Sequence, residues 1–382
     1  MKKISLLFPS AFRYPSLPAE WRFGLEAARG FAHELGEDFL YIVERVDDPA
    51  ALAGVPYREA RAGQKFSLRR LHLLSLYYFV WLLFFFLAHP RWRRGTLYIT
   101  ERKIGLGALL LRAIFRFPYK VIFESHSLEE PWLDRFLYRH ADHVIFVTRV
   151  MYDNARREGL ITGEKSFSVL AAAVNMMKFE GVTRDPAELR SDLNLPENKK
   201  IVLFAGRFRA MGSDKGVVPL IKIAGALSDK EIVFCFVGGT GKEIESARAE
   251  ARAEGVEERC IFVPFVDERK IIRYLLAADA LIYLPPREKF FLYETSPMKL
   301  FEYMAAGKPI ILADYPSLRE ALAEDEAFFV DPDDRDALTR VIGEAVSGSP
   351  RAAAAARAAA ARAAGNTWEE RAKKIIAIAA AL

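Results

Sequence analysis

Residues 293–312 read YETSPMKLFEYMAAGKPIIL, a helix-forming stretch that leads into a short apolar strand. Ser296 is a strong N-cap residue and Pro297 suits the first helical position, so the sequence predicts a helix from there to Gly307. The apolar run PIIL at 309–312 then has the length of a buried strand. This order, helix and then strand, is one step of an α/β fold.

The same alternation continues in both directions along the chain. Short β-branched and aromatic runs are separated by longer segments with helical periodicity, which predicts parallel sheets with helices on both faces. The fold class is therefore α/β. The strands are expected at 4–8, 39–43, 96–100, 120–124, 143–147 and 167–170 in the first half, and at 200–205, 231–237, 260–263, 280–284, 309–312 and 327–330 in the second.

A chain of 382 residues is long enough for two domains with separate cores. The polar stretch 180–200 has no strand pattern and contains Pro186 and Pro196, as expected of a connection between domains. We therefore expect an N-terminal domain at 1–185 and a C-terminal domain at 186–365. A C-terminal helix at 366–382 follows, and it begins with a capping-box pattern in Thr367 and Glu370.

Cysteine usage and the N-terminal sequence both indicate a cytoplasmic location. Cys235 and Cys260 lie in apolar runs, where a small buried thiol in a reducing compartment is the usual interpretation. The first apolar stretch is interrupted by Pro9 and Arg13, so it is too short for a secretory signal and is expected to form the first strand.

Positive charge is concentrated in the first half of the chain. Residues 58–120 contain thirteen Lys and Arg against two Glu, a local charge near +11 in a chain whose net charge is +5. Within this region the apolar run Leu73 to Ala88 is too short for a comfortable membrane span of about 20 residues. It is expected either to be a buried core helix or, as part of a docking segment at 69–94, to bind an anionic membrane at the inner face. The flanking basic residues are Arg69, Arg70, Arg91, Arg93 and Arg94.

The N-terminus of the helix predicted near Pro297 is a candidate anion site. The free amides of Met298 and Lys299, together with the helix dipole, favour a negatively charged group such as a pyrophosphate. Glu294 precedes this point and Glu302 follows it, roughly 9 Å further along the helix at about 1.5 Å per residue. Because a carboxylate can accept hydrogen bonds from two hydroxyls, the order of parts fits a nucleotide-diphosphate sugar.

This segment resembles the E-x7-E region of family 4 glycosyltransferases, in its SPxKxxEYMAxGKP variant. The similarity covers nearly the whole chain. Further matching pieces are LFAGR (203–207), Lys215 with Gly216, VGGTG (237–241), FVPFVDERKI (262–271), AADALIYLPP (277–286) and TWEERA (367–372). The resemblance implies the GT-B fold, in which two Rossmann-like domains face each other across a cleft and the C-terminal helix crosses back. It also implies transfer of a hexosyl-type sugar with retention of configuration, to a lipid-linked or cell-surface saccharide.

The resemblance assigns roles to particular residues. Glu294 would hold the transferred sugar, Glu302 the ribose, and Arg207 with Lys215 the diphosphate. Lys215 lies eight positions after Arg207, where five are typical of the family. Other donor-side residues are expected in the glycine-rich loop and beside the base: Gly238, Gly239 and Val266.

Two polar residues end a predicted strand of the first half. Glu124 and His126 follow KVIF at the edge where open α/β sheets place ligands. The string VIFESH resembles the family strand ending in E-x-H, which implies that His126 faces the reaction centre. Glu124 is expected on the acceptor side, or as a residue that orients this loop.

Other function classes are disfavoured. Phe236 and Glu243 occupy the first glycine and the Ser/Thr positions of a Walker loop, which excludes a P-loop hydrolase. No nucleic-acid module or zinc-type cluster is found, and the acidic string 331–336 is expected to form turns and caps, so neither a metal nor a cofactor is predicted. A sugar-nucleotide epimerase of the same architecture, or a non-catalytic membrane-associated relative, stays open.

Overall fold

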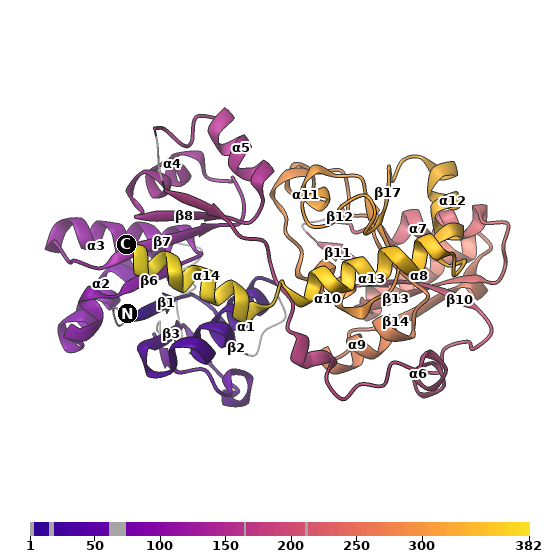
Figure 1. Ribbon diagram of the computed structural model, residues 1–382, viewed down its shortest axis with the longest axis horizontal. Helices are drawn as coiled ribbons and strands as arrows, with labels where there is room; N and C mark the ends of the chain where they lie inside the picture. The colour runs from indigo at the N-terminus through magenta and orange to yellow at the C-terminus, as the bar shows by residue number, and fades with distance from the viewer. Residues whose placement is uncertain (1–3, 15–18, 61–73, 164–165, 211–212) are drawn as a thin grey trace. The chain divides into compact units, whose positions relative to one another are not determined.

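The structure is a computed structural model that describes residues 4–14, 19–60, 74–163, 166–210 and 213–382 (Figure 1). The chain divides into two compact units. The first unit comprises Met1–Ala172 with Trp368–Leu382, and the second comprises Ala173–Thr367. The domain boundary predicted between residues 185 and 186 thus lies inside the second unit.

The first unit is built on a seven-stranded sheet whose described pairings are all parallel. Its order is β5 (Tyr57–Glu59), β3 (Phe39–Val43), β1 (Leu6–Pro9), β6 (Thr96–Ile99), β7 (Lys120–Ser125), β8 (His143–Phe146) and β9 (Phe167–Val169). The six predicted strands are confirmed. Strand β5 was not predicted, because its three residues YRE lack an apolar pattern and pair on one side only.

Helices cover this sheet, and one of them comes from the far end of the chain. They are α1 (Ala19–Leu35), α2 (Leu74–Ala88), α3 (Arg102–Phe115), α4 (Pro131–His140) and α5 (Arg149–Arg157), with the short turn η4 (Pro90–Arg94) after α2. The C-terminal helix α14 (Trp368–Ala381) packs against α1, as Figure 1 shows in yellow and indigo. Phe23 of α1 and Trp368 of α14 meet edge to face, with ring centroids 4.9 Å apart.

The second unit is built on a six-stranded sheet, again with parallel pairings throughout the described strands. Its order is β14 (Cys260–Pro264), β13 (Ile232–Gly239), β10 (Lys200–Ala205), β15 (Ala280–Tyr283), β16 (Ile310–Ala313) and β17 (Phe328–Val330), which confirms all six predictions. The chain runs outward from β10 to β14 and then restarts at β15. Such a reversal leaves a ligand crevice at the carboxyl ends of β10 and β15.

The helices of the second unit are α6 (Pro186–Leu193), α7 (Val217–Ala226), α8 (Gly241–Ala253), α9 (Glu268–Ala277), α10 (Met298–Ala306), α11 (Pro316–Arg319), α12 (Arg335–Ala345) and α13 (Pro350–Ala364). Helix α6 lies in the stretch expected to be irregular, because Asp185 caps it and Pro186 occupies its first turn. Arg190 of α6 is buried and donates to Asp279 at 2.7 Å, which ties this helix to the second unit. Both units are α/β, so the predicted fold class is confirmed.

Helix α2 is apolar on two opposite faces. Tyr78, Leu82 and Phe86 are buried in the core, as expected of a core helix. Leu76, Val80, Phe84 and Leu87 are exposed to between 42% and 65%. Among the described residues, no helix is both long and apolar enough to cross a membrane. Leu73, Arg69 and Arg70, which belong to the predicted docking segment, lie outside the described residues.

A buried ion pair fastens α14 to the first sheet. Arg371 donates through Nη2 to Oε2 of Glu124 at 2.7 Å, and the Tyr98 hydroxyl donates to the same oxygen at 2.6 Å. The Arg371 guanidinium also donates through Nε to the carbonyl of Ala171 at 2.8 Å. Although burial alone would raise the pKa of Glu124, Arg371 and His126 lower it to about 2. The carboxylate therefore stays charged over the working pH range.

Replacing one partner of this pair should destabilise the first unit strongly. Arg371→Met leaves a buried carboxylate without its cation, a change that typically costs about 3–5 kcal/mol. The double variant Arg371→Met, Glu124→Gln should lose less than the sum of the single variants, as measured by denaturant unfolding. Because the pKa of Glu124 is lowered on folding, its contribution is complete above pH 4.5 and is lost as the pH falls towards 2.

Lys373→Met is the matched control, because Lys373 lies on the same helix in an exposed pair with Glu370. Equal unfolding midpoints for Arg371→Met and Lys373→Met would contradict the structural role of the buried pair.

Candidate functional site: an anion site at the N-terminus of α10

Helix α10 begins two residues after the predicted N-cap and ends as predicted. Pro297 is the N-cap, with an extended ψ of 122°, so helical geometry starts at Met298 and the assignment of Ser296 as N-cap is wrong. Gly307 ends the helix in the left-handed conformation, at φ 67°. Met298 and Lys299 are consequently the first two helical residues, and their amides have no acceptor within the helix.

A hydrogen bond sets the position of α10 relative to the sheet. The backbone amide of Ala205, the last residue of β10, donates to the buried hydroxyl of Tyr303 at 2.8 Å. The loop that follows β10 contains Gly206 and Arg207. The N-terminal turn of α10 therefore lies close to this loop, at the crevice between β10 and β15.

The two predicted carboxylates lie at opposite ends of this segment. Glu294 ends a single π-helical turn, η7 (Phe290–Glu294), and is 3% exposed, with Lys289 Nζ 3.8 Å from its Oε1. Glu302 lies in the second turn of α10, with Lys178 Nζ 4.0 Å from its Oε1. Lys178 also pairs with Glu268 at 3.1 Å. Sequence reasoning missed Lys178, because only the fold brings it near Glu302.

The unusual spacing between Arg207 and Lys215 has a structural explanation. Two short strands among the described intervening residues, β11 (Arg209–Ala210) and β12 (Ser213–Asp214), pair antiparallel. This pairing returns the chain, so the Lys215 amide donates to the carbonyl of Phe208 at 2.9 Å. This bond brings Lys215 next to the residue that follows Arg207, and burial together with the charge of Arg207 lowers the pKa of Lys215. The extra residues therefore leave Lys215 beside Arg207.

The glycine-rich string 237–241 spans the end of β13, the N-cap Thr240 and the start of α8, so it joins a strand to a helix as predicted. Gly238 has φ 115°, and a Cβ there would lie 2.7 Å from the carbonyl oxygen of Gly206, so the close approach of the two loops requires glycine. The carbonyl of Gly239 accepts from the amide of Phe265 at 3.2 Å, next to the predicted base contact Val266. Glu243 forms a capping box with Thr240, which gives this residue a structural role at the start of α8.

In the first unit, His126 lies beside the buried carboxylate of Glu124. Nε2 of His126 is 3.1 Å from Oε1 of Glu124, and the histidine side chain is 36% exposed. Its ring meets Phe23 edge to face at 4.6 Å. Glu124 is fully buried, so it can orient His126 but is screened from solvent. Arg371 was not singled out from the sequence, although it lies within the matching string TWEERA.

The acidic string 331–336 forms turns and caps, as expected. Asp334 caps α12 by accepting from the amide of Ala337 at 2.9 Å, and Asp331 pairs with Arg287 at 2.5 Å. Within the described ranges, no group of three or more His, Cys, Asp or Glu side chains is placed to hold a metal ion. Cys235 and Cys260 are buried free thiols whose pKa is raised to about 12 by burial.

Comparison with known sequences finds a match to a protein family within the second unit. Residues 185–362 match the model of the family described as glycosyl transferases group 1. A D-inositol 3-phosphate glycosyltransferase of Xylanimonas cellulosilytica is 28% identical over 193 residues, which are 50% of this chain and 44% of that protein. The chain thus spans less than half the length of this curated relative.

Comparison with solved structures extends the likeness to the whole chain. A sucrose-phosphate synthase of Thermosynechococcus elongatus superposes with a TM-score of 0.77 at 18% identity, covering 98% of each chain. The HepE protein of Anabaena in complex with UDP superposes with a TM-score of 0.74 at 16% identity, covering 99% of this chain and 100% of that one. Residues 185–362 thus match the family of group 1 glycosyl transferases, in agreement with the resemblance to family 4 glycosyltransferases, and the chain as a whole has the GT-B fold.

Proposed function

We propose that the protein is a retaining glycosyltransferase that moves a hexosyl-type sugar from a nucleotide-diphosphate sugar to a hydroxyl of a lipid-linked or cell-surface saccharide. The observation that carries this proposal is the N-terminus of α10, which lies beside Arg207 and Lys215 at the crevice of the second sheet. A helix N-terminus with two neighbouring cations suits a diphosphate better than a neutral ligand.

The same groups suit the chemistry of the leaving group. When the sugar leaves, negative charge grows on the diphosphate oxygens. The amides of Met298 and Lys299 and the side chains of Arg207 and Lys215 would stabilise that charge without a metal ion. Glu294 would then bind hydroxyls of the sugar, and Glu302 would bind the ribose after displacing Lys178.

We further propose a front-face displacement. The bond between the anomeric carbon and the diphosphate oxygen breaks, and a bond to the acceptor oxygen forms on the same face of the sugar. The acceptor proton passes to an oxygen of the departing phosphate, so no enzyme carboxylate is consumed as a nucleophile. His126, held by Glu124, would stabilise charge beside the reacting sugar, as the family resemblance implies.

Relatives suggest where a search for the donor should begin. One solved structure of Anabaena HepE contains UDP and another contains UDP-glucose. UDP-sugars are therefore the first members of a donor panel, followed by GDP- and ADP-sugars. A true donor binds the folded protein, so it should raise the melting temperature.

Removing a donor contact should abolish transfer while leaving the protein folded. Glu302→Ala, Arg207→Ala and Glu294→Ala should each lower kcat/KM on the order of 10²- to 10³-fold, because each loses an interaction with a charged or hydroxylated donor group. Release of nucleoside diphosphate in the presence of acceptor measures the rate. Arg252→Ala and Glu324→Ala change exposed residues of the same unit and should retain full activity.

Wild-type turnover by all three site variants would contradict this assignment. A donor converted to an isomer without any acceptor would instead favour an epimerase. A wild-type protein that binds no nucleotide sugar in calorimetry would favour a non-catalytic relative.

We also propose that the exposed face of α2 and α3 docks on an anionic membrane, which would bring the protein to a lipid-linked acceptor. The exposed residues of α2 recur every three or four positions and so form one row. Helix α3 packs against α2 and adds Leu110, Ile114 and Phe115, which are exposed to between 40% and 65%. Arg91, Arg94 and Arg116 are exposed close by in the sequence and supply charge that anionic headgroups attract.

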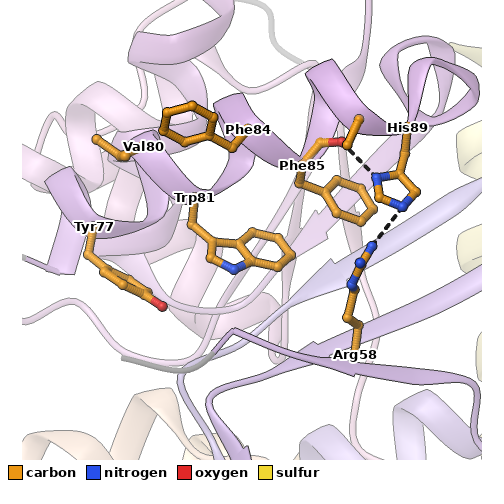
Figure 2. Close-up of a pocket in the computed structure, with 8 residues that line it drawn as sticks. Arg58, Tyr77, Val80, Trp81, Phe84, Phe85 and His89 are labelled. Carbon is orange, nitrogen blue, oxygen red and sulfur yellow. Dashed lines mark hydrogen bonds between the residues drawn. The ribbon is translucent and has the colours of Figure 1, made fainter. Parts of the chain in front are cut away.

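A groove adjoins this row and adds both apolar surface and a cation (Figure 2). It has a volume of about 420 Å³ and shares Val80 and Phe84 with the exposed row. At one end the Arg58 guanidinium lies 2.7 Å from His89 and 5.7 Å from the centre of the Phe85 ring. An acyl chain in the groove would thus place its headgroup near a positive charge.

The docking face should be testable by co-sedimentation with vesicles. Wild-type protein should bind phosphatidylglycerol vesicles, and the bound fraction should fall as salt rises, since screening weakens surface charge interactions. Phe84→Asp with Ile114→Asp should lower the bound fraction at least about fivefold, because charged groups cannot insert among lipid chains.

Trp132→Asp is the matched control, since Trp132 is a similarly exposed aromatic residue, at 64%, that lies on α4 and does not belong to the row. Equal binding by the double variant and this control would rule out the α2–α3 face as the docking surface.

A further inference from the structure

Lys299 places a cation in an apolar cage. Its Nζ is buried and, among the described residues, has no hydrogen-bond partner. Nζ lies 4.8 Å from the ring centre of Phe204 and 4.8 Å from that of Tyr283. The faces of aromatic rings attract an ammonium group, but they replace only part of the hydration that burial removes.

The cage lies at the point in the second sheet where a ligand is expected. Phe204 is on β10 and Tyr283 is on β15, the two paired strands between which the chain order reverses. A Cβ at Gly206 would lie 2.4 Å from the Lys299 Nζ, so the ammonium lies directly against the loop that carries Arg207. Gly206 also has φ 137°, which a residue with a side chain rarely adopts.

The charged groups around Nζ do not balance it. Burial and the neighbouring charge of Lys215 together lower the pKa of Lys299 to about 7, although Glu302 opposes them. Lys215 in turn is affected by Arg207. Tyr283 supplies no negative charge, because burial raises the pKa of its phenol far above the working range. Lys299 thus lies near Lys215 and against the loop that carries Arg207, whereas Glu302, which opposes the effect on Lys299, itself lies 4.0 Å from Lys178.

We propose that the Lys299 side chain is a third cationic partner of the donor diphosphate, and that it gains a proton when the diphosphate binds. This inference rests on the proposed function. It differs from the role of the Lys299 amide, because the ammonium lies under the Gly206 loop and approaches the anion from the side of the sheet. A diphosphate between Lys299, Lys215 and Arg207 would supply the negative charge that this cluster lacks.

The proton balance follows from the lowered pKa. At pH 8 about nine-tenths of Lys299 is neutral in the free protein, whereas at pH 6 about nine-tenths is charged. An adjacent diphosphate favours the charged form and so raises the pKa. Binding should therefore take up close to one proton at Lys299 at pH 8, and roughly a tenth of a proton at pH 6.

Calorimetry in buffers of different ionisation enthalpy measures this uptake. With UDP and with inorganic pyrophosphate as probes, wild-type protein should take up about one proton more per bound ligand at pH 8 than Lys299→Met, and the difference should nearly vanish at pH 6. Any protons that the ligand itself gains or loses on binding contribute equally for wild type and for Lys299→Met, so they cancel in the difference. Lys299→Met should also bind about tenfold more weakly or worse, whereas Lys222→Met, which changes an exposed lysine of α7, should match wild type.

A second measurement shows whether Lys299→Met folds and whether the lysine is structural. Methionine fills the cage without a buried charge, so the variant should melt at or above the wild-type temperature at pH 6. Since the folded-state pKa of Lys299 is lowered, the unfolded chain binds more protons between about pH 7 and 10.5, and wild-type stability rises through that range. The difference in melting temperature between Lys299→Met and wild type should therefore become smaller towards pH 10.

Binding of the probes by wild type and by Lys299→Met distinguishes failure of this inference from failure of the proposed function. If wild-type protein binds the probes and Lys299→Met binds them equally, with the same proton uptake, the inference is overturned and the proposed function stands. If wild-type protein binds neither probe, both are overturned. A variant that melts well below wild type at pH 6 would show that the lysine serves packing and would also overturn the inference.

Discussion

The hydrogen bond from the Ala205 amide to the Tyr303 hydroxyl is the contact on which the candidate site depends. It joins the carboxyl end of β10 to the middle of α10, so the first amides of that helix come to the loop that carries Arg207. Both groups are buried, and a buried polar group without a partner is costly, so the geometry is held in one arrangement. The same strand end is where the chain order of the sheet reverses. The strand order of the sheet and the hydrogen bond between Ala205 and Tyr303 thus both indicate a ligand site at the carboxyl end of β10.

The electrostatics of that place are those of a site prepared for an anion. Lys215 and Lys299 have pKa values lowered by burial, and each is affected by a neighbouring cation. Proteins commonly accept such a loss of stability where function requires it. The buried pair in the first unit shows the opposite arrangement, because Glu124 and Arg371 neutralise each other and connect the last helix to the first sheet. The charges of Glu124 and Arg371 are paired and serve the fold, whereas at Lys299 the carboxylate of Glu302 offsets only part of the effect of burial and of Lys215.

Sequence reasoning was accurate where local chemistry decides the structure. All twelve predicted strands are confirmed, because apolar runs of that length have few alternatives in an α/β fold. The end of α10 at Gly307 was also predicted, since glycine adopts the left-handed conformation readily, but its start was misplaced because Pro297 is extended instead of helical.

Contacts between residues far apart in the sequence could not be predicted. The contact of Tyr303 with Ala205, the cage of Phe204 and Tyr283 and the partners of Glu124 arise only when strands and helices pack. The sequence also could not show that two short strands before Lys215 pair antiparallel and keep it close to Arg207.

The central claim is that the N-terminus of α10 binds the diphosphate of a sugar nucleotide. A crystal structure of the protein with a bound nucleoside diphosphate tests it most directly. We expect phosphate oxygens about 2.7–3.2 Å from the amides of Met298 and Lys299, with the side chains of Arg207 and Lys215 bound to the same diphosphate. A nucleotide bound with its phosphates away from this helix end, and with these four residues facing solvent, would contradict it.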